Sequence, residues 1–97
     1  MFKLFVVSKE ETKTLEVRAE DFFIIADKFN LNLEGACKLE SNKIIPSLNQ
    51  CLKLTRLYYQ DLKRNENFNA SDFLKTLRGV ISLMFFALNS NSELSWQ

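Results

Sequence analysis

Residues 46–88 read PSLNQCLKLTRLYYQDLKRNENFNASDFLKTLRGVISLMFFAL, and their apolar spacing predicts two long helices that make up nearly half of the chain. Pro46 suits a first helical turn, and Ser47 with Gln50 three residues later is a candidate capping box. These two signals put the helix start one or two residues apart, and the helix then extends to about Arg64. Its apolar residues share one side at helical spacing: Leu48, Cys51, Leu52, Thr55, Tyr58, Tyr59 and Leu62.

The second helix has the stronger start signal. Asn69 is placed as its N-cap, Asp72 follows at the third helical position, and Phe68 is placed to pack against Phe73. The short loop at residues 65–67 predicts an antiparallel helical hairpin. The apolar face of this helix contains Phe73, Leu74, Leu77, Val80, Ile81, Met84, Phe85 and Leu88.

The sequence before this hairpin predicts β-structure. Residues 2–7 and 14–18 alternate in the period of two that strands show, and the polar residues 8–13 between them suit a turn. Residues 20–29 fit either a helix with an apolar face or a buried strand, and we favour the helix. Residues 37–45 are interpreted as a second short hairpin that turns at Ser41 and Asn42.

These elements predict one small α+β domain over residues 1–97. Residues 1–45 mix a β-hairpin, a short helix and short strands, residues 46–88 form the helical hairpin, and residues 89–97 form a polar tail. We see no repeat, linker or low-complexity segment that would divide the chain.

The composition argues against an enzyme. The chain has no histidine, which removes the commonest general base and the commonest metal ligand. Its two cysteines cannot form a four-cysteine zinc site, and its two glycines cannot form a glycine-rich phosphate loop. We therefore expect no catalytic residue, no metal and no cofactor. A histidine-free enzyme that uses Asp, Glu, Tyr or Cys37 ranks third among the alternatives.

The apolar runs predict the compartment. Residues 4–7 are too few for the core of a signal peptide, and residues 80–88 are too few to span a bilayer. We therefore expect a cytoplasmic protein with no membrane partner, in which thiols stay reduced. Cys51 is expected to be buried. The alternatives for Cys37 are a disulfide with Cys51 or a thiol activated by Lys38.

The end of the second helix is a candidate interface. Leu83 and Phe86 fall on the side where polar residues are expected, so the helix is apolar nearly all round from Val80 onward. Either the rest of the monomer covers this surface, or Leu83, Phe86 and Trp96 form a contact with a partner or with a second copy in a homodimer.

The first helix carries a basic stripe opposite its apolar face. Lys53, Arg56, Lys63 and Arg64 cluster there, although the net charge of the whole chain is only +1. Such a stripe suits nucleic-acid phosphate or an acidic protein, or it is an ordinary solvated face.

By elimination, the sequence predicts a non-enzymatic protein-binding module: a regulator, an inhibitor or immunity-type partner, or an assembly factor. Self-association through Leu83, Phe86 and Trp96 belongs to this hypothesis. A small nucleic-acid-binding protein that uses the basic stripe is the alternative. Abundant Asn, Lys, Ile and Phe, with scarce Gly and Pro, would suit an AT-rich genome or a mobile element.

Overall fold

The computed structural model describes residues 2–28, 43–64 and 72–97, which form an α+β domain with a four-stranded antiparallel sheet and three helices. The strand order in the sheet is β2-β1-β4-β3. The elements in chain order are β1 (Phe2–Val7), β2 (Thr12–Val17), α1 (Ala19–Lys28), β3 (Lys43–Ile44), α2 (Leu48–Arg64), α3 (Asp72–Asn89) and β4 (Leu94–Trp96).

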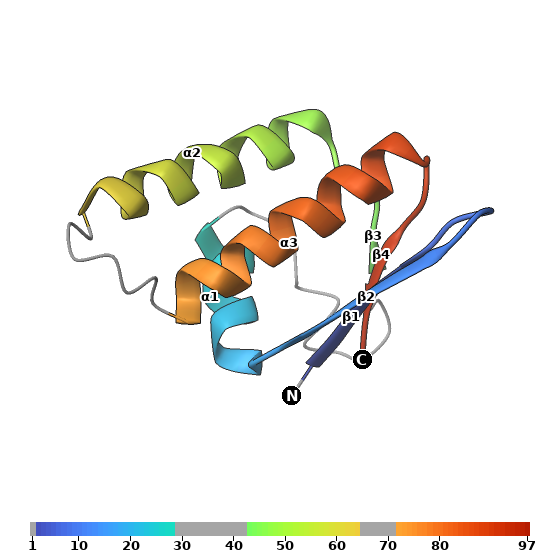
Figure 1. Cartoon of the computed structure of the whole chain (residues 1–97), viewed down its shortest axis with the longest axis horizontal. Coiled ribbons are helices and arrows are strands. Elements are labelled where there is room, and N and C mark those ends of the chain that lie inside the picture. The colour runs from blue at the N-terminus through green and yellow to red at the C-terminus, as the bar shows by residue number, and fades with distance from the viewer. Residues whose placement is uncertain (1, 29–42, 65–71) are drawn as a thin grey trace.

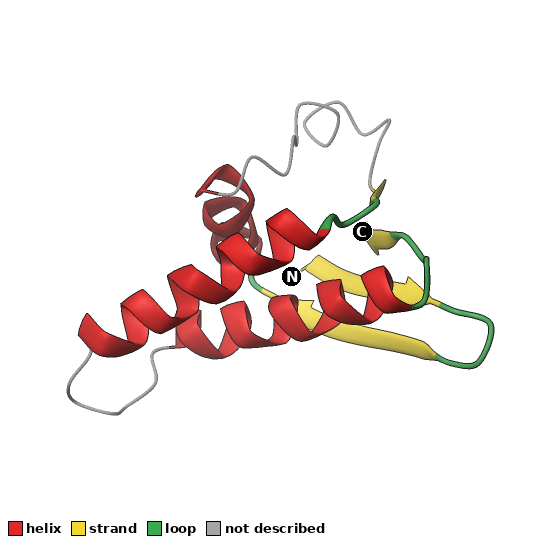
Figure 2. Cartoon of the chain, turned by 90° about the horizontal axis from the view of Figure 1, so that it is seen from above, coloured by secondary structure: helices red, strands yellow, loops and turns green. Residues whose placement is uncertain are grey.

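Helix α3 lies at the centre of the fold. It packs against β1, β2 and β4 on one side and against α2 on another, while α1 contacts its N-terminal half (Figures 1 and 2). The two long helices run side by side, as the predicted helical hairpin requires. The α+β class and the packing of a helix pair against strands are confirmed.

The predicted N-terminal hairpin is present. Phe2 pairs with Val17 and Val7 pairs with Thr12, so β2 begins two residues earlier than its alternation suggested. The connecting turn is held by Ser8, whose backbone N–H and side-chain hydroxyl both donate to the carbonyl oxygen of Glu11, at 2.9 and 2.8 Å. A serine hydroxyl that bonds nearby backbone groups is typical of such turns.

Residues 19–28 form a helix, α1, which confirms the interpretation favoured for this segment. Asp21 stands in the first turn, where a negative charge is favoured by the helix dipole. Its carboxylate is almost fully buried and accepts a hydrogen bond from Nε of Arg18 at 2.9 Å. The buried charge is therefore paired, as burial demands.

The capping box predicted for α2 is also confirmed. The backbone N–H of Ser47 donates to Oε1 of Gln50 at 2.9 Å, and the backbone N–H of Gln50 donates to Oγ of Ser47 at 3.1 Å. The two residues thus satisfy donors that the first helical turn leaves free. The N-cap predicted for α3 at Asn69 lies outside the described residues.

The predicted polar tail is wrong for residues 94–96, which form strand β4 inside the sheet. Leu4 pairs with Trp96 and Val6 pairs with Leu94 on one side, and Ile44 pairs with Leu94 on the other. Leu94 and Trp96 point to the core while Ser95 points away, because successive side chains of a strand alternate. Asn91, at φ 52°, makes the turn from α3 into β4, a conformation that asparagine tolerates.

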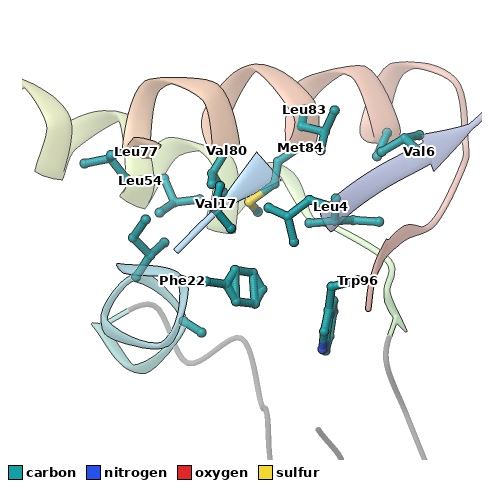
Figure 3. Close-up of a cluster of buried hydrophobic side chains, with 14 of the residues drawn as sticks. Leu4, Val6, Val17, Phe22, Leu54, Leu77, Val80, Leu83, Met84 and Trp96 are labelled. Carbon is teal, nitrogen blue, oxygen red and sulfur yellow. The ribbon is translucent and has the colours of Figure 1, made fainter. Parts of the chain in front are cut away.

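Side chains from every layer meet in one core (Figure 3). Phe22 of α1 faces Trp96 of β4 with ring centroids 5.5 Å apart, and Met84 of α3 lies above them. Burying a side chain of this size contributes about 1.5–3 kcal/mol. The core comprises Leu4, Val6, Val17, Phe22, Ile25, Ala26, Cys51, Leu54, Leu77, Val80, Leu83, Met84, Ala87, Leu94 and Trp96.

The second short hairpin, predicted at residues 37–45, lies mostly outside the described residues. Its described part contains strand β3, which is two residues long and pairs with β4. Cys37 also lies outside the described residues.

Candidate protein-binding surface

The surface predicted at the end of α3 is covered by the protein itself. Leu83 and Trp96 are each only 4% exposed. Helix α3, which contains Leu83, packs against the sheet and α2, and the ring of Trp96 on β4 packs against Phe22 of α1. Phe86 is half-buried, with Nζ of Lys13 lying 4.5 Å from its ring centroid. The prediction that Leu83 and Trp96 present an exposed contact is therefore wrong. Self-association stays a prediction, and of the three residues predicted for it Phe86 alone keeps part of its surface exposed.

Helix α2 is turned differently from the sequence-based prediction. Its most buried residues are Cys51 and Leu54, with Leu57 and Tyr58 partly buried beside them. Leu54 and Leu57 were not on the predicted apolar face. The reason is that the eight apolar residues among the 17 of this helix are spread over more than half of its circumference, so periodicity alone offered two faces that could be buried.

Part of the face that was predicted to be buried is open to solvent, although Cys51 on that face is buried as expected. Leu48 is 55% exposed, Leu52 41% and Tyr59 58%, and Ile45 just before the helix is 76% exposed. The spacings of four and seven residues align Leu48, Leu52 and Tyr59 along one side of α2, and Ile45 comes three residues before the helix begins. We call Ile45, Leu48, Leu52 and Tyr59 the outer stripe.

Tyr59 of the outer stripe packs against a neighbouring aromatic ring. The ring of Tyr58, which is partly buried against the core, packs edge-to-face against the ring of Tyr59 with centroids 5.6 Å apart. Aromatic pairs in this geometry stabilise each other beyond their buried area. Tyr59 is therefore held in place while most of its surface remains free for contact.

A basic border runs beside the outer stripe. Lys53, Arg56 and Lys63 are exposed, and their helical positions place them next to the stripe on the side turned away from the core. Among the described residues the ion pairs are Arg18 with Asp21 and Lys43 with Glu93, so neither involves α2. Arg64 ends α2, and its side chain lies outside the described part of the structure.

Other exposed apolar side chains are more scattered. Phe23 and Ile24 of α1 are 41% and 46% exposed, and the ring of Phe23 already packs against that of Phe2, 5.4 Å away. Val7 is exposed at the end of β1. None of these forms a row as long as the outer stripe.

No three His, Cys, Asp or Glu side chains gather in the described ranges where they could hold a metal ion. Every buried side-chain nitrogen and oxygen there has a hydrogen-bond partner. Cys51 is fully buried, and burial raises the pKa of its thiol, which keeps it protonated and unreactive.

None of the helices in residues 2–28, 43–64 and 72–97 has both the length and the apolar character needed to cross a membrane. Comparison with known proteins finds no matching family model, no matching curated protein and no matching solved structure. The functional argument therefore depends on the surface of the chain.

Proposed function

We propose that this chain is a non-enzymatic protein-binding module that binds its partner through the outer stripe of α2. The observation that supports the proposal is that α2 has apolar residues on two sides, one buried and one exposed. One side is packed through Cys51 and Leu54, and the other exposes Leu48, Leu52 and Tyr59 together. Exposed apolar residues in a row are typical of surfaces that another molecule covers.

The outer stripe consists of residue types that contribute strongly to the free energy of binding when a partner buries them. Fully burying a leucine or isoleucine contributes about 1.5–3 kcal/mol, and tyrosine is enriched among the residues that dominate binding. Since the core closes without these side chains, the domain can keep them free in the unbound state. Such a surface suits a cytoplasmic regulator, inhibitor, immunity-type partner or assembly factor.

Nucleic-acid binding through Lys53, Arg56, Lys63 and Arg64 is the second candidate, because three of these side chains are exposed on one side of α2. It is less favoured for two reasons. A few phosphate contacts give weak binding at physiological salt. A phosphate backbone would also leave the neighbouring leucines without an apolar partner.

The two candidates are separated by capturing partners with the tagged chain from cells of its source, with and without nuclease. We expect one stoichiometric protein that survives nuclease and is lost with the double substitution Leu48→Glu and Leu52→Glu. Ile24→Glu is the matched control, since Ile24 is as exposed as Leu52 but lies on α1. Co-purifying nucleic acid that is lost at higher salt and with Arg56→Glu would favour the second candidate.

A further inference from the structure

We infer that the occupant of the outer stripe is an acidic amphipathic helix of another protein. The inference rests on the proposed function and names the chemistry of its partner. It depends on three observations: the shape of the outer stripe, the positive charge of the basic border, and the net charge of the residues outside α2.

The shape of the stripe favours a helix. From Leu48 to Tyr59 the exposed side chains lie on one side of α2 over about 16 Å, at a rise of about 1.5 Å per residue. A second helix with apolar residues at the same three- and four-residue spacing can pack its ridge beside this one along its whole length. The basic residues at one side would then face the flank of that helix.

The positive charge of α2 predicts a negative charge on the flank of the partner helix. Its residues include four basic side chains and one acidic side chain, and Arg56 and Lys63 lie closest to the stripe. Carboxylates on the flank of the partner would lie opposite them, and complementary charge orients a partner and speeds its association. The partner helix therefore carries Asp or Glu beside its apolar row.

The charge of the rest of the chain argues against an anionic lipid surface. Of the thirteen basic and twelve acidic residues in the chain, nine and eleven lie outside α2, so the remainder has a net negative charge. An extended anionic surface would repel this remainder, whereas a single helix covers α2 alone. The same reasoning disfavours a long nucleic acid.

The test is selection from a display library of helical peptides of about 17 residues, since isolated helices shorter than about 12–15 residues are marginal in water. The library varies all solvent-facing positions of the peptide helix, and the full 97-residue protein is the bait. We expect enriched peptides to combine apolar residues at three- and four-residue spacing with flanking Asp or Glu. Leu52→Glu should weaken their binding at least tenfold, and Ile24→Glu should leave it unchanged.

A charge-reversed bait makes the test specific. With Arg56→Glu and Lys63→Glu, both exposed positions, the same library should enrich Lys or Arg at the flanks instead. Circular dichroism of each variant establishes that it is folded. Enriched peptides that are extended, or that lack acidic residues yet depend on Leu52, would overturn the acidic-helix inference and leave the proposed function standing.

No enrichment of any peptide would overturn the inference, and the capture experiment would then test the proposed function by itself. Two further outcomes would overturn both the inference and the proposed function. The first is peptide binding that is insensitive to Leu52→Glu. The second is binding of phosphatidylserine vesicles or single-stranded DNA that Arg56→Glu and Lys63→Glu abolish, with no peptide bound.

Discussion

Gly79 of α3 lies directly against the side chain of Leu15 of β2: a Cβ atom at position 79 would stand 2.8 Å from Cδ2 of Leu15. The missing side chain lets the helix approach the edge strand of the sheet closely. A glycine inside a helix costs about 1 kcal/mol relative to alanine, so this close approach offsets a local disadvantage.

A double-mutant cycle tests this contact. In the wild-type background Gly79→Ala gains helix propensity but forces the end of Leu15 to move, so we expect a small net change in the free energy of unfolding. After Leu15→Ala the obstruction is gone, and Gly79→Ala should stabilise by about 1 kcal/mol. Denaturant unfolding of the four proteins measures the coupling. Equal effects of Gly79→Ala in both backgrounds would show that the residues do not touch.

Leu54 and Leu52, two residues apart on α2, should respond oppositely to truncation. Leu54 is fully buried, and Leu54→Ala should lower the free energy of unfolding by about 2–5 kcal/mol. Leu52 is 41% exposed, and Leu52→Ala should change it by about 0.5 kcal/mol. Denaturant unfolding compares the pair. A larger loss at Leu52 would mean that α2 presents its other face to the core.

Trp96, the one tryptophan of the chain, reports directly on β4. Because it is 4% exposed against Phe22, its fluorescence emission should be blue-shifted in the native protein and move to the red on unfolding. Trp96→Ala should cost about 3–5 kcal/mol of stability. Gln97→Ala, at the exposed neighbour, is the control. Native emission at the wavelength of free tryptophan would contradict the position of β4.

The capping box at the start of α2 predicts that Ser47→Ala measurably lowers the free energy of unfolding. The substitution removes the hydroxyl that accepts the N–H of Gln50, and N-cap losses of this kind cost about 0.5–2 kcal/mol. Ser47→Asp should restore most of the stability, since aspartate caps equally well. Thermal unfolding provides the comparison. Equal stability of the alanine and serine proteins would argue against the cap.

Cys51 should be inert in the native protein. Its thiol is buried with a raised pKa, so a Cys37→Ser protein should react with iodoacetamide only on unfolding. Above the ordinary cysteine pKa of about 8.5 the unfolded chain loses this proton while the native state keeps it, so rising pH destabilises the fold. Cys51→Ala should reduce that pH dependence. Rapid native alkylation would contradict the burial.

Local patterns were sufficient where the signal lay within a few residues. The hairpin, α1 and the capping box of α2 depend on alternation, on helical spacing and on side chains that bond their own backbone neighbours. Strand β4 has only three residues, and its position depends on pairing with Leu4 and Val6 at the other end of the chain. No local pattern could have specified that pairing.

The candidate surface was predicted in part. The basic residues Lys53, Arg56 and Lys63 are exposed on α2 as expected, but Leu83 and Trp96 are in the core. An apolar helix end looks the same in sequence whether a sheet or a partner covers it. Likewise, Leu48 and Leu54 are equally apolar, and only the position of α3 decides which of them is buried.

The position of β4 between β1 and β3 has a consequence for the order in which the protein folds during synthesis. Strand β1 can pair with β2 at once, but two paired strands alone are marginally stable in water. Its other edge stays open until residues 94–96 have been made, so the core under Leu4 and Val6 is the last part to close. Such long-range pairing slows folding, and the nascent chain carries an apolar strand with one unpaired edge through most of its translation.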